Sequence, residues 1–195
     1  MQGSLSCPKE LEKAGEVPYL VGMMTRTAQS LISELLDAAK AAGADGADAM
    51  LARGEGTSID LRLGKVEASE RSEDFDAGLR VFVGQRNASI STSQLDSDNI
   101  KALAERAVAM AKIAPEDPYA RLATADELAT SIPELEMFDP YIPTVDTLTD
   151  MARAAEDAAR SHKGITNSEG GSASHGVANI LIATSNGFSA DYKRS

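Results

Sequence analysis

The sequence has few of the residues from which common catalytic sites are built. It contains one cysteine, Cys7, two histidines, His162 and His175, and no tryptophan. A single cysteine excludes an intrachain disulfide and a zinc site made of cysteines. No H-E-x-x-H run accompanies the two histidines, whereas catalytic zinc usually takes three protein ligands. No G-x-S-x-G motif is present either, so this chain alone carries neither a metallopeptidase site nor a nucleophilic hydrolase site.

Long apolar runs and basic clusters are also missing from the sequence. A membrane-spanning helix needs about 18 or more consecutive apolar residues, and the sequence contains no such run. The formal net charge is −11, from 30 acidic and 19 basic residues, and an acidic surface repels phosphate backbones and anionic lipid. We therefore expect no direct contact with nucleic acid and no membrane. The near-absence of cysteine fits a reducing cytoplasm.

The glycine-rich stretch, the two histidines and a run of acidic residues could each be functional, but each also has an ordinary structural interpretation. The glycine-rich stretch Gly164–Gly176 matches neither common phosphate-loop pattern and predicts a hairpin turn. His162 is expected at a helix C-terminus, where a cation suits the helix dipole, and His175 in a surface turn. Paired carboxylates can perform acid–base chemistry, but a local acidic run with basic neighbours predicts a solvated strand edge instead. That run contains Glu67, Glu70, Glu73, Asp74 and Asp76.

The spacing of apolar residues predicts an α+β fold, with helices packed on one face of an antiparallel β-sheet. Apolar residues recur at helical spacing in three segments and at every second position in strand-like segments. Thr25 or Thr27 is expected to cap the first helix and Thr144 the third. The third helix is expected to bury Leu148, Met151, Ala152, Ala155 and Ala159. The expected elements are a helix at 25–43, an antiparallel meander of four or five strands at 47–93, a helix at 97–113, an extended connection at 114–144, a helix at 145–161 and strands at 164–195.

The domain organisation follows from the same pattern. Residues 1–24, which include Cys7, have mixed charge and no clear period, and we expect a disordered leader or an upstream extension. Residues 25–195 are expected to form one α+β domain. The sequence stops at Ser195 within a segment that reads as strand, and an unpaired terminal strand leaves an open sheet edge. We therefore expect the chain to be truncated before a β-rich C-terminal domain.

Five motifs occur in a specific order along the chain. They are G-T-S-I-D-L-R-L-G-K-V-E-A-S-E-R-S-E-D-F-D-A-G-L-R-V-F-V-G at 56–84, S-I-S-T-S-Q-L at 89–95, A-P-E-D-P-Y-A at 114–120, I-T-N-S-E-G at 165–170 and S-N-G-F-S at 185–189. Together they resemble the N-terminal domain of the TldD/PmbA (TldE) metallopeptidase family, over a span from about residue 25 to the end. The third and fifth motifs are closer to the PmbA-like branch than to the TldD-like branch.

The resemblance implies a hydrolase subunit that acts in proteolysis in the cytoplasm. In this family, TldD-like members carry zinc, whereas PmbA-like members lack it and pair with TldD in a heterodimer that degrades peptides and unfolded chains. The family is also linked to maturation of a peptide antibiotic and, through that activity, to modulation of DNA gyrase. The resemblance implies zinc only in a TldD-like partner or in the C-terminal domain missing from this chain. It assigns no catalytic or metal-binding residue to this sequence.

Two places are expected to contact a peptide substrate or the partner subunit. They are a serine-rich strand face, with Ser89, Ser91 and Ser93, and a loop at Asn167–Ser174 that contains Asn167, Ser168 and Glu169. An extended substrate could also add a strand to the edge of the sheet. The leading hypothesis is the N-terminal domain of a PmbA-like subunit that is non-catalytic by itself. The alternatives are a free-standing protein-binding module and a truncated remnant without activity.

Overall fold

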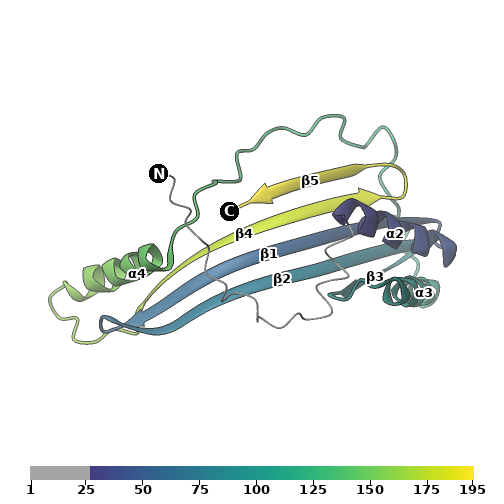
Figure 1. Cartoon of the computed structure of the whole chain (residues 1–195). Coiled ribbons are helices and arrows are strands. Elements are labelled where there is room, and N and C mark those ends of the chain that lie inside the picture. Colours follow the sequence, from purple (N-terminus) through teal and green to yellow (C-terminus); the bar gives the residue numbers. More distant parts are fainter. Residues whose placement is uncertain (1–26) are drawn as a thin grey trace, which may run out of the picture.

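The computed structural model describes residues 27–195, which form a five-stranded antiparallel sheet and three helices (Figure 1). The strand order is β3-β2-β1-β4-β5, and every neighbouring pair is antiparallel. The predicted α+β class is confirmed. The predicted leader at 1–24, with Cys7, lies outside the described residues. The elements are α2 (Ala28–Ala41), β1 (Gly46–Arg62), β2 (Lys65–Val83), β3 (Arg86–Thr92), α3 (Ser97–Ile113), α4 (Val145–Arg160), β4 (Gly171–Thr184) and β5 (Ser189–Arg194).

Each helix begins at a side chain that caps its first turn, and the three predicted helices are confirmed. The capping residues are Thr27, Asp96 and Thr144, whose side-chain oxygens accept hydrogen bonds from the backbone N–H three positions on. Such a bond satisfies one of the N–H groups that a helix start leaves without a partner. Within residues 27–195, no helix is long and apolar enough to cross a membrane.

Two of the strands are longer than the sequence pattern predicts. β1 has 17 residues and β2 has 19, so residues 46–92 form three strands and the prediction of four or five is wrong. Apolar alternation marks only the two ends of β1 and the C-terminal end of β2, where helices pack against them. Between those ends, side chains such as Glu55 and Ser72 are polar and exposed. A strand exposed on both faces has no hydrophobic period of two.

The helices lie on one face of the sheet. The other face is open except near Phe82, which is buried and lies, with Leu122 of the long connection, beside Gly46. Along β1, Ala47, Ala49 and Leu51 are buried, whereas Asp48 and Met50 between them are not. We call the side with the buried residues the helix face and the other side the open face. Figure 1 shows α2 and α3 at one end of the long strands and α4 at the opposite end. The main core at the first end includes Leu31, Leu35, Leu79, Val81, Ile100, Leu103 and Val108.

The helix α4 packs on the far end of β1 and β4 through a small and partly polar surface. Leu148 and Ala152 are buried there, as predicted, and Ile59 and Leu61 of β1 are buried on the same face. The other predicted core residues of this helix, Met151, Ala155 and Ala159, are exposed, so that prediction is wrong. The third buried residue of α4 is instead Glu156, with 1% of its surface exposed.

Glu156 is buried because it binds the turn between β1 and β2. Its Oε1 accepts the backbone N–H of Leu63 at 2.8 Å, and its Oε2 accepts that of Gly64 at 2.9 Å. Leu63 and Gly64 have φ angles of 49° and 76°, the positive values that a two-residue type I′ hairpin requires at both positions. One carboxylate therefore satisfies both turn donors and joins α4 to the hairpin.

Leu63 is the strained member of this turn, because a left-handed conformation costs a non-glycine residue about 1–2 kcal/mol. Its side chain is 49% exposed, so it gives little packing in return. We expect Leu63→Asn to raise the free energy of unfolding by about 1 kcal/mol, since Asn-Gly is the favoured pair for this turn. Urea unfolding of the two chains checks this, and an unchanged or lower midpoint would contradict it. The matched control is Val66→Asn, a similarly exposed apolar residue with ordinary backbone angles.

Candidate functional site

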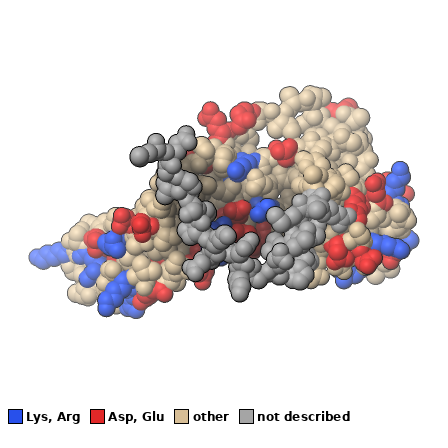
Figure 2. Space-filling view, in the orientation of Figure 1, with Lys and Arg blue, Asp and Glu red and all other residues tan. Residues whose placement is uncertain are grey.

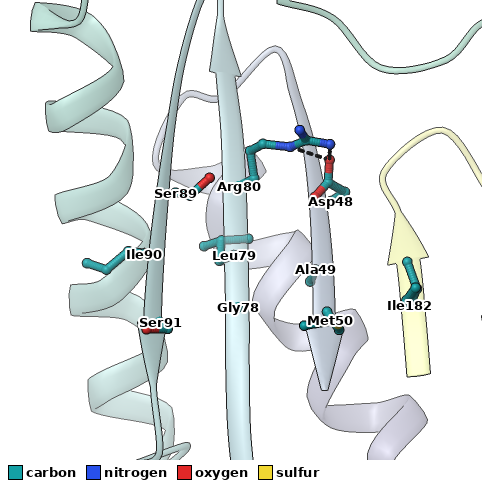
Figure 3. Close-up of a pocket in the computed structure, with 10 residues that line it drawn as sticks. All are labelled: Asp48, Ala49, Met50, Gly78, Leu79, Arg80, Ser89, Ile90, Ser91 and Ile182. Carbon is teal, nitrogen blue, oxygen red and sulfur yellow. Dashed lines mark hydrogen bonds and ion pairs between the residues drawn. The ribbon is translucent and has the colours of Figure 1, made fainter. Parts of the chain in front are cut away.

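The open face of the sheet contains a shallow groove at the end where α2 and α3 cover the opposite face. Figure 3 shows the ten residues that line it, which come from β1, β2, β3 and β4. The groove has a volume of about 480 Å³. Its axis follows one row of the sheet, in which Ser91, Gly78, Met50 and Ile182 are successive cross-strand neighbours. The site is therefore a product of strand register.

The groove exists because a glycine interrupts this row of side chains. Gly78 lies between Ser91 and Met50, and a Cβ added there would meet no atom within 4 Å. Met50 is 45% exposed and belongs, with Ile182, to the apolar part of the lining. Exposed apolar side chains beside a hollow are typical of binding surfaces. The groove can accordingly accept a side chain or an extended backbone.

One end of the groove is fixed by an ion pair. Both Nε and Nη2 of Arg80 donate to Oδ2 of Asp48, at 2.8 and 2.6 Å, as the dashed lines in Figure 3 mark. The guanidinium also lies 5.2 Å from the centre of the Phe82 ring, within the range of a cation–π contact. Asp48 and Arg80 are the only ionisable residues among the ten that line the groove. The site is therefore suited to binding, and it offers no unpaired acid or base for catalysis.

The structure separates the two predicted contact regions. Ser89 and Ser91 lie on the open face of β3, both exposed and both part of the groove. Ser93 lies beyond the end of β3 at Thr92, so it does not continue the strand face as predicted. Asn167, Ser168 and Glu169 lie in the loop between α4 and β4, at the opposite end of the long strands.

The loop before β4 has a structural role in the end that α4 covers. The carbonyl oxygen of Ser168 accepts Nε of Arg62 at 3.0 Å, and its Oγ accepts the N–H of Gly170 at 2.9 Å. Asn167 and Glu169 are exposed. Ser168 thus fixes the loop to the end of β1, and the two exposed neighbours are the ones that remain accessible to a partner or a peptide.

The histidines and acidic residues do not assemble a metal site in the part of the chain that the structure describes. Within residues 27–195, no three side chains among His, Cys, Asp and Glu lie together so as to hold a metal ion. His162 follows the C-terminal end of α4, as predicted. The prediction of a surface turn at His175 is wrong, because it lies in β4 opposite Thr57. The glycine-rich stretch is correspondingly a loop only up to Gly170.

The A-P-E-D-P-Y-A motif holds the start of the long connection against the turn between β2 and β3. The N–H of Asp117 donates to the carbonyl oxygen of Gln85 at 2.7 Å. Arg86 binds Oε1 of Glu116 at 3.0 Å and the carbonyl oxygen of Lys112 at 2.9 Å. All three contacts are made by Gln85 and Arg86, at the start of β3. This motif therefore positions β3 and the serine side of the groove.

The S-N-G-F-S motif joins the turn between β4 and β5 to the rest of the fold. Ser185 makes two hydrogen bonds with Ala47. The N–H of Ser185 donates to the carbonyl oxygen of Ala47 at 2.8 Å, and the N–H of Ala47 donates to Oγ of Ser185 at 2.9 Å. Nδ2 of Asn186 donates to the carbonyl oxygen of Ala123 in the long connection at 2.7 Å. Gly187 has a φ angle of 99°, which the turn requires. The motif aligns β4 with β1 and thereby sets the register that forms the groove.

Two family models match this chain in succession. The model described as PmbA/TldA metallopeptidase domain 1 matches residues 47–111, and the model described as PmbA/TldA metallopeptidase central domain matches residues 138–195. The first covers β1, β2, β3 and most of α3, and the second covers α4, β4 and β5. Because β4 pairs with β1 along 14 residues, the segments matched by the two models share one sheet.

Curated relatives support the same relationship. The chain is 34% identical over 129 residues to the metalloprotease PmbA of Escherichia coli O157:H7, an alignment that covers 66% of this chain and 29% of that protein. It is 32% identical over 165 residues to a metalloprotease PmbA homologue of Haemophilus influenzae, with 84% of this chain and 36% of that protein covered. The chain thus spans about a third of the length of these relatives.

Solved structures share the fold. A proposed modulator of DNA gyrase from Bacteroides thetaiotaomicron has a TM-score of 0.73 at 21% identity, over 86% of this chain and 39% of that one. A second proposed modulator of DNA gyrase, from Thermotoga maritima, has a TM-score of 0.66 at 16% identity, over 86% and 37%. TldE from Thermococcus kodakarensis has a TM-score of 0.59 at 14% identity, over 84% and 37%.

Proposed function

The chain belongs to the PmbA/TldD (TldE) metallopeptidase family, and we propose that it is the N-terminal part of a PmbA-like subunit in a cytoplasmic zinc metallopeptidase complex. In this role it is non-catalytic by itself. It pairs with a TldD-like catalytic subunit and helps to hold peptides and unfolded chains for cleavage. The observation that carries the proposal is the match of two consecutive models of one family to segments that share a sheet.

The chemistry of the described residues favours a role in binding rather than in catalysis of peptide hydrolysis. They do not fit a zinc site, because within residues 27–195 no three potential ligands are grouped. Zinc, when bound by the partner subunit or by a C-terminal domain of the complete subunit, would supply the activated water for peptide hydrolysis. The residues of this chain would instead bind and orient: the serine hydroxyls and the apolar lining of the groove contact the partner or the peptide.

The distribution of charge is consistent with a protein or peptide ligand. Figure 2 shows acidic and basic side chains interspersed at both ends of the molecule. Together with the net charge of −11, this favours a ligand other than a phosphate backbone.

The proposal is tested by co-expression of this chain with a TldD-like subunit. We expect the two to co-purify, and we expect hydrolysis of an unfolded test protein to rise only when both are present. Co-purification without any gain in hydrolysis would favour the free-standing binding module. Failure to co-purify would contradict the proposal and favour the inactive remnant.

A groove-filling substitution identifies the surface involved. Gly78→Val should reduce co-purification about tenfold, because its side chain fills the hollow, and the loss of a central contact in an interface commonly costs a factor of this size or more. The fold should tolerate it, since the Cβ position is open. Gly54→Val is the matched control, because Gly54 lies in the neighbouring strand on the same open face and its Cβ position is equally open. Equal effects of the two substitutions would exclude the groove as the contact surface.

A further inference from the structure

The strand β2 is paired on both sides for only part of its length. β3 pairs with β2 from Ala77 to Val83, whereas β1 pairs with β2 from Lys65 to Phe82, with one register shift between Val66 and Ala68. Within the described residues, the segment Lys65–Asp76 therefore has a neighbouring strand on one side only. We call this segment the free β2 edge. At about 3.4 Å per residue it extends for roughly 40 Å.

A free edge of this kind exposes backbone N–H and C=O groups that can pair with another strand. Natural proteins commonly shorten, cover or charge such edges to prevent unwanted pairing. This edge is neither short nor covered by a described element, and 10 of its 12 residues are exposed. Its charges therefore decide which strand can pair with it.

The charges differ between the two faces of the free β2 edge. On the helix face, Arg71 lies 3.1 Å from Glu73 and 4.0 Å from Glu55. Arg53 also lies 3.6 Å from Glu55, so two basic side chains balance two acidic ones there. On the open face, β2 presents Glu70, Asp74 and Asp76, whose partners in β1 are Ser58, Gly54 and Ala52. Among residues 27–195, none of these three carboxylates takes part in an ion pair. The open face of this edge is thus a row of uncompensated negative charge.

This charge pattern disfavours a second copy of the same chain. Two antiparallel copies of the free β2 edge would bring two acidic rows together, and like charges opposite each other in a sheet are destabilising. An extended segment with lysine or arginine at alternate positions would place a cation beside each carboxylate. Opposite charges in cross-strand pairs stabilise pairing.

We propose that the free β2 edge binds a basic, extended peptide segment as an added strand, with its cationic side chains beside Glu70, Asp74 and Asp76. The added strand would continue the line of β3, which ends at Thr92 opposite Ala77. One end of the peptide would then approach Ser91 and the groove on the open face. The inference deepens the proposed function, because it names the class of peptide that the subunit would hold.

The test measures binding without any catalytic partner, so its failure is distinguishable from failure of the proposed complex. The probe is a fluorescein-labelled 11-residue peptide of alternating lysine and threonine. We expect it to bind the purified 195-residue chain, and we expect its glutamate–threonine counterpart not to bind. A peptide N-methylated at alternate residues should bind at least tenfold more weakly, because N-methylation removes the donors that strand addition needs.

Matched variants separate the edge from the general negative charge of the protein. The combination Glu70→Gln, Asp74→Asn and Asp76→Asn should weaken binding about tenfold, as the loss of three cross-strand charge pairs predicts. The control combination Glu105→Gln, Asp37→Asn and Asp157→Asn makes the same chemical changes on exposed helix positions and should leave binding unchanged.

Three results would overturn the inference. They are absence of binding to the wild-type chain at low ionic strength, equal binding of the N-methylated peptide, and equal losses in the two triple variants. Sedimentation equilibrium provides a fourth test, because it measures whether the chain forms a dimer. A dimer of the wild-type chain that the edge variant abolishes would show that a second copy occupies the edge, and would also overturn it.

Discussion

Replacement of Gly171 by alanine should detach α4 from the sheet and destabilise the protein by about 3 kcal/mol. A Cβ at this position would lie 2.3 Å from the carbonyl oxygen of Ala152 and 3.2 Å from the backbone nitrogen of Glu156. Both are backbone atoms of the helix, so no side chain can rotate to make room. Overpacking of this kind costs about 1–3 kcal/mol or more, and here the helix must move away from the strand.

Hydrogen exchange and urea unfolding together measure this effect. In Gly171→Ala, amides of α4 should exchange much faster while those of α2 and α3 stay protected, because the main core lies at the other end. Gly176→Ala, in the same strand as Gly171, is the control, since its Cβ would lie 3.5 Å from the nearest atom, the carbonyl oxygen of Glu55. If α4 stays equally protected in both variants, the close approach at Gly171 does not determine its position.

Glu156→Gln should destabilise the protein and loosen the turn between β1 and β2. The glutamine amide can satisfy only one of the two N–H donors of that turn. Burial alone would raise the pKa of Glu156, but the N–H groups of Gly64 and Leu63, with the Ser168 hydroxyl and the charge of Arg160, hold that pKa below its ordinary value. In the glutamine variant, the NH₂ group faces one N–H donor and leaves it unpaired in a buried place. We expect at least about tenfold faster exchange of the turn amides in the variant.

The pH dependence of stability gives an independent measurement. A carboxyl group with a lowered pKa in the folded state stabilises the protein above its unfolded pKa, and the contribution is lost as pH falls through the folded pKa. The difference in unfolding midpoint between wild type and Glu156→Gln should therefore be full near pH 6 and shrink below the ordinary pKa of about 4.5. Asp157→Asn on the exposed side of the same helix is the control. A difference that stays constant down to pH 3 would contradict this role for Glu156.

Both residues bear on the proposed peptide site. The turn that Glu156 binds leads directly into Lys65, where the free β2 edge begins. Gly171 brings α4 close enough for Glu156 to reach that turn. Loss of either contact should loosen the start of the edge, and we expect weaker binding of the basic peptide in both variants.

The sequence predicted the helices well because their signals are local. Thr27, Asp96 and Thr144 are capping residues that act within one turn, and the apolar stripes of α2 and α3 repeat at the helical period. The predicted α+β class followed from those signals and from the alternation at the strand ends. Local signals of this type need no knowledge of the rest of the chain.

The features that the sequence did not predict depend on contacts between distant residues. The burial of Glu156 depends on N–H groups 93 and 92 positions away in the chain, and no hydrophobic pattern indicates it. The lengths of β1 and β2 depend on pairing between polar segments. The groove depends on the register that places Gly78 between Ser91 and Met50. Among the predicted contact residues, Ser89 and Ser91 line the groove, and their role in binding stays a prediction.

The pairing of β1 with β4 has a consequence for synthesis of the protein on the ribosome. β1 lies in the middle of the finished sheet, but its partner β4 begins only at Gly171, well after α3 ends at Ile113. At about 5–20 residues per second, the nascent chain waits roughly 3–12 s between these points. During that interval β1 is an edge strand with Leu51 and Ile59 uncovered by β4 and α4. Translation speed across residues 114–170 should therefore influence how much of the protein aggregates before it is complete.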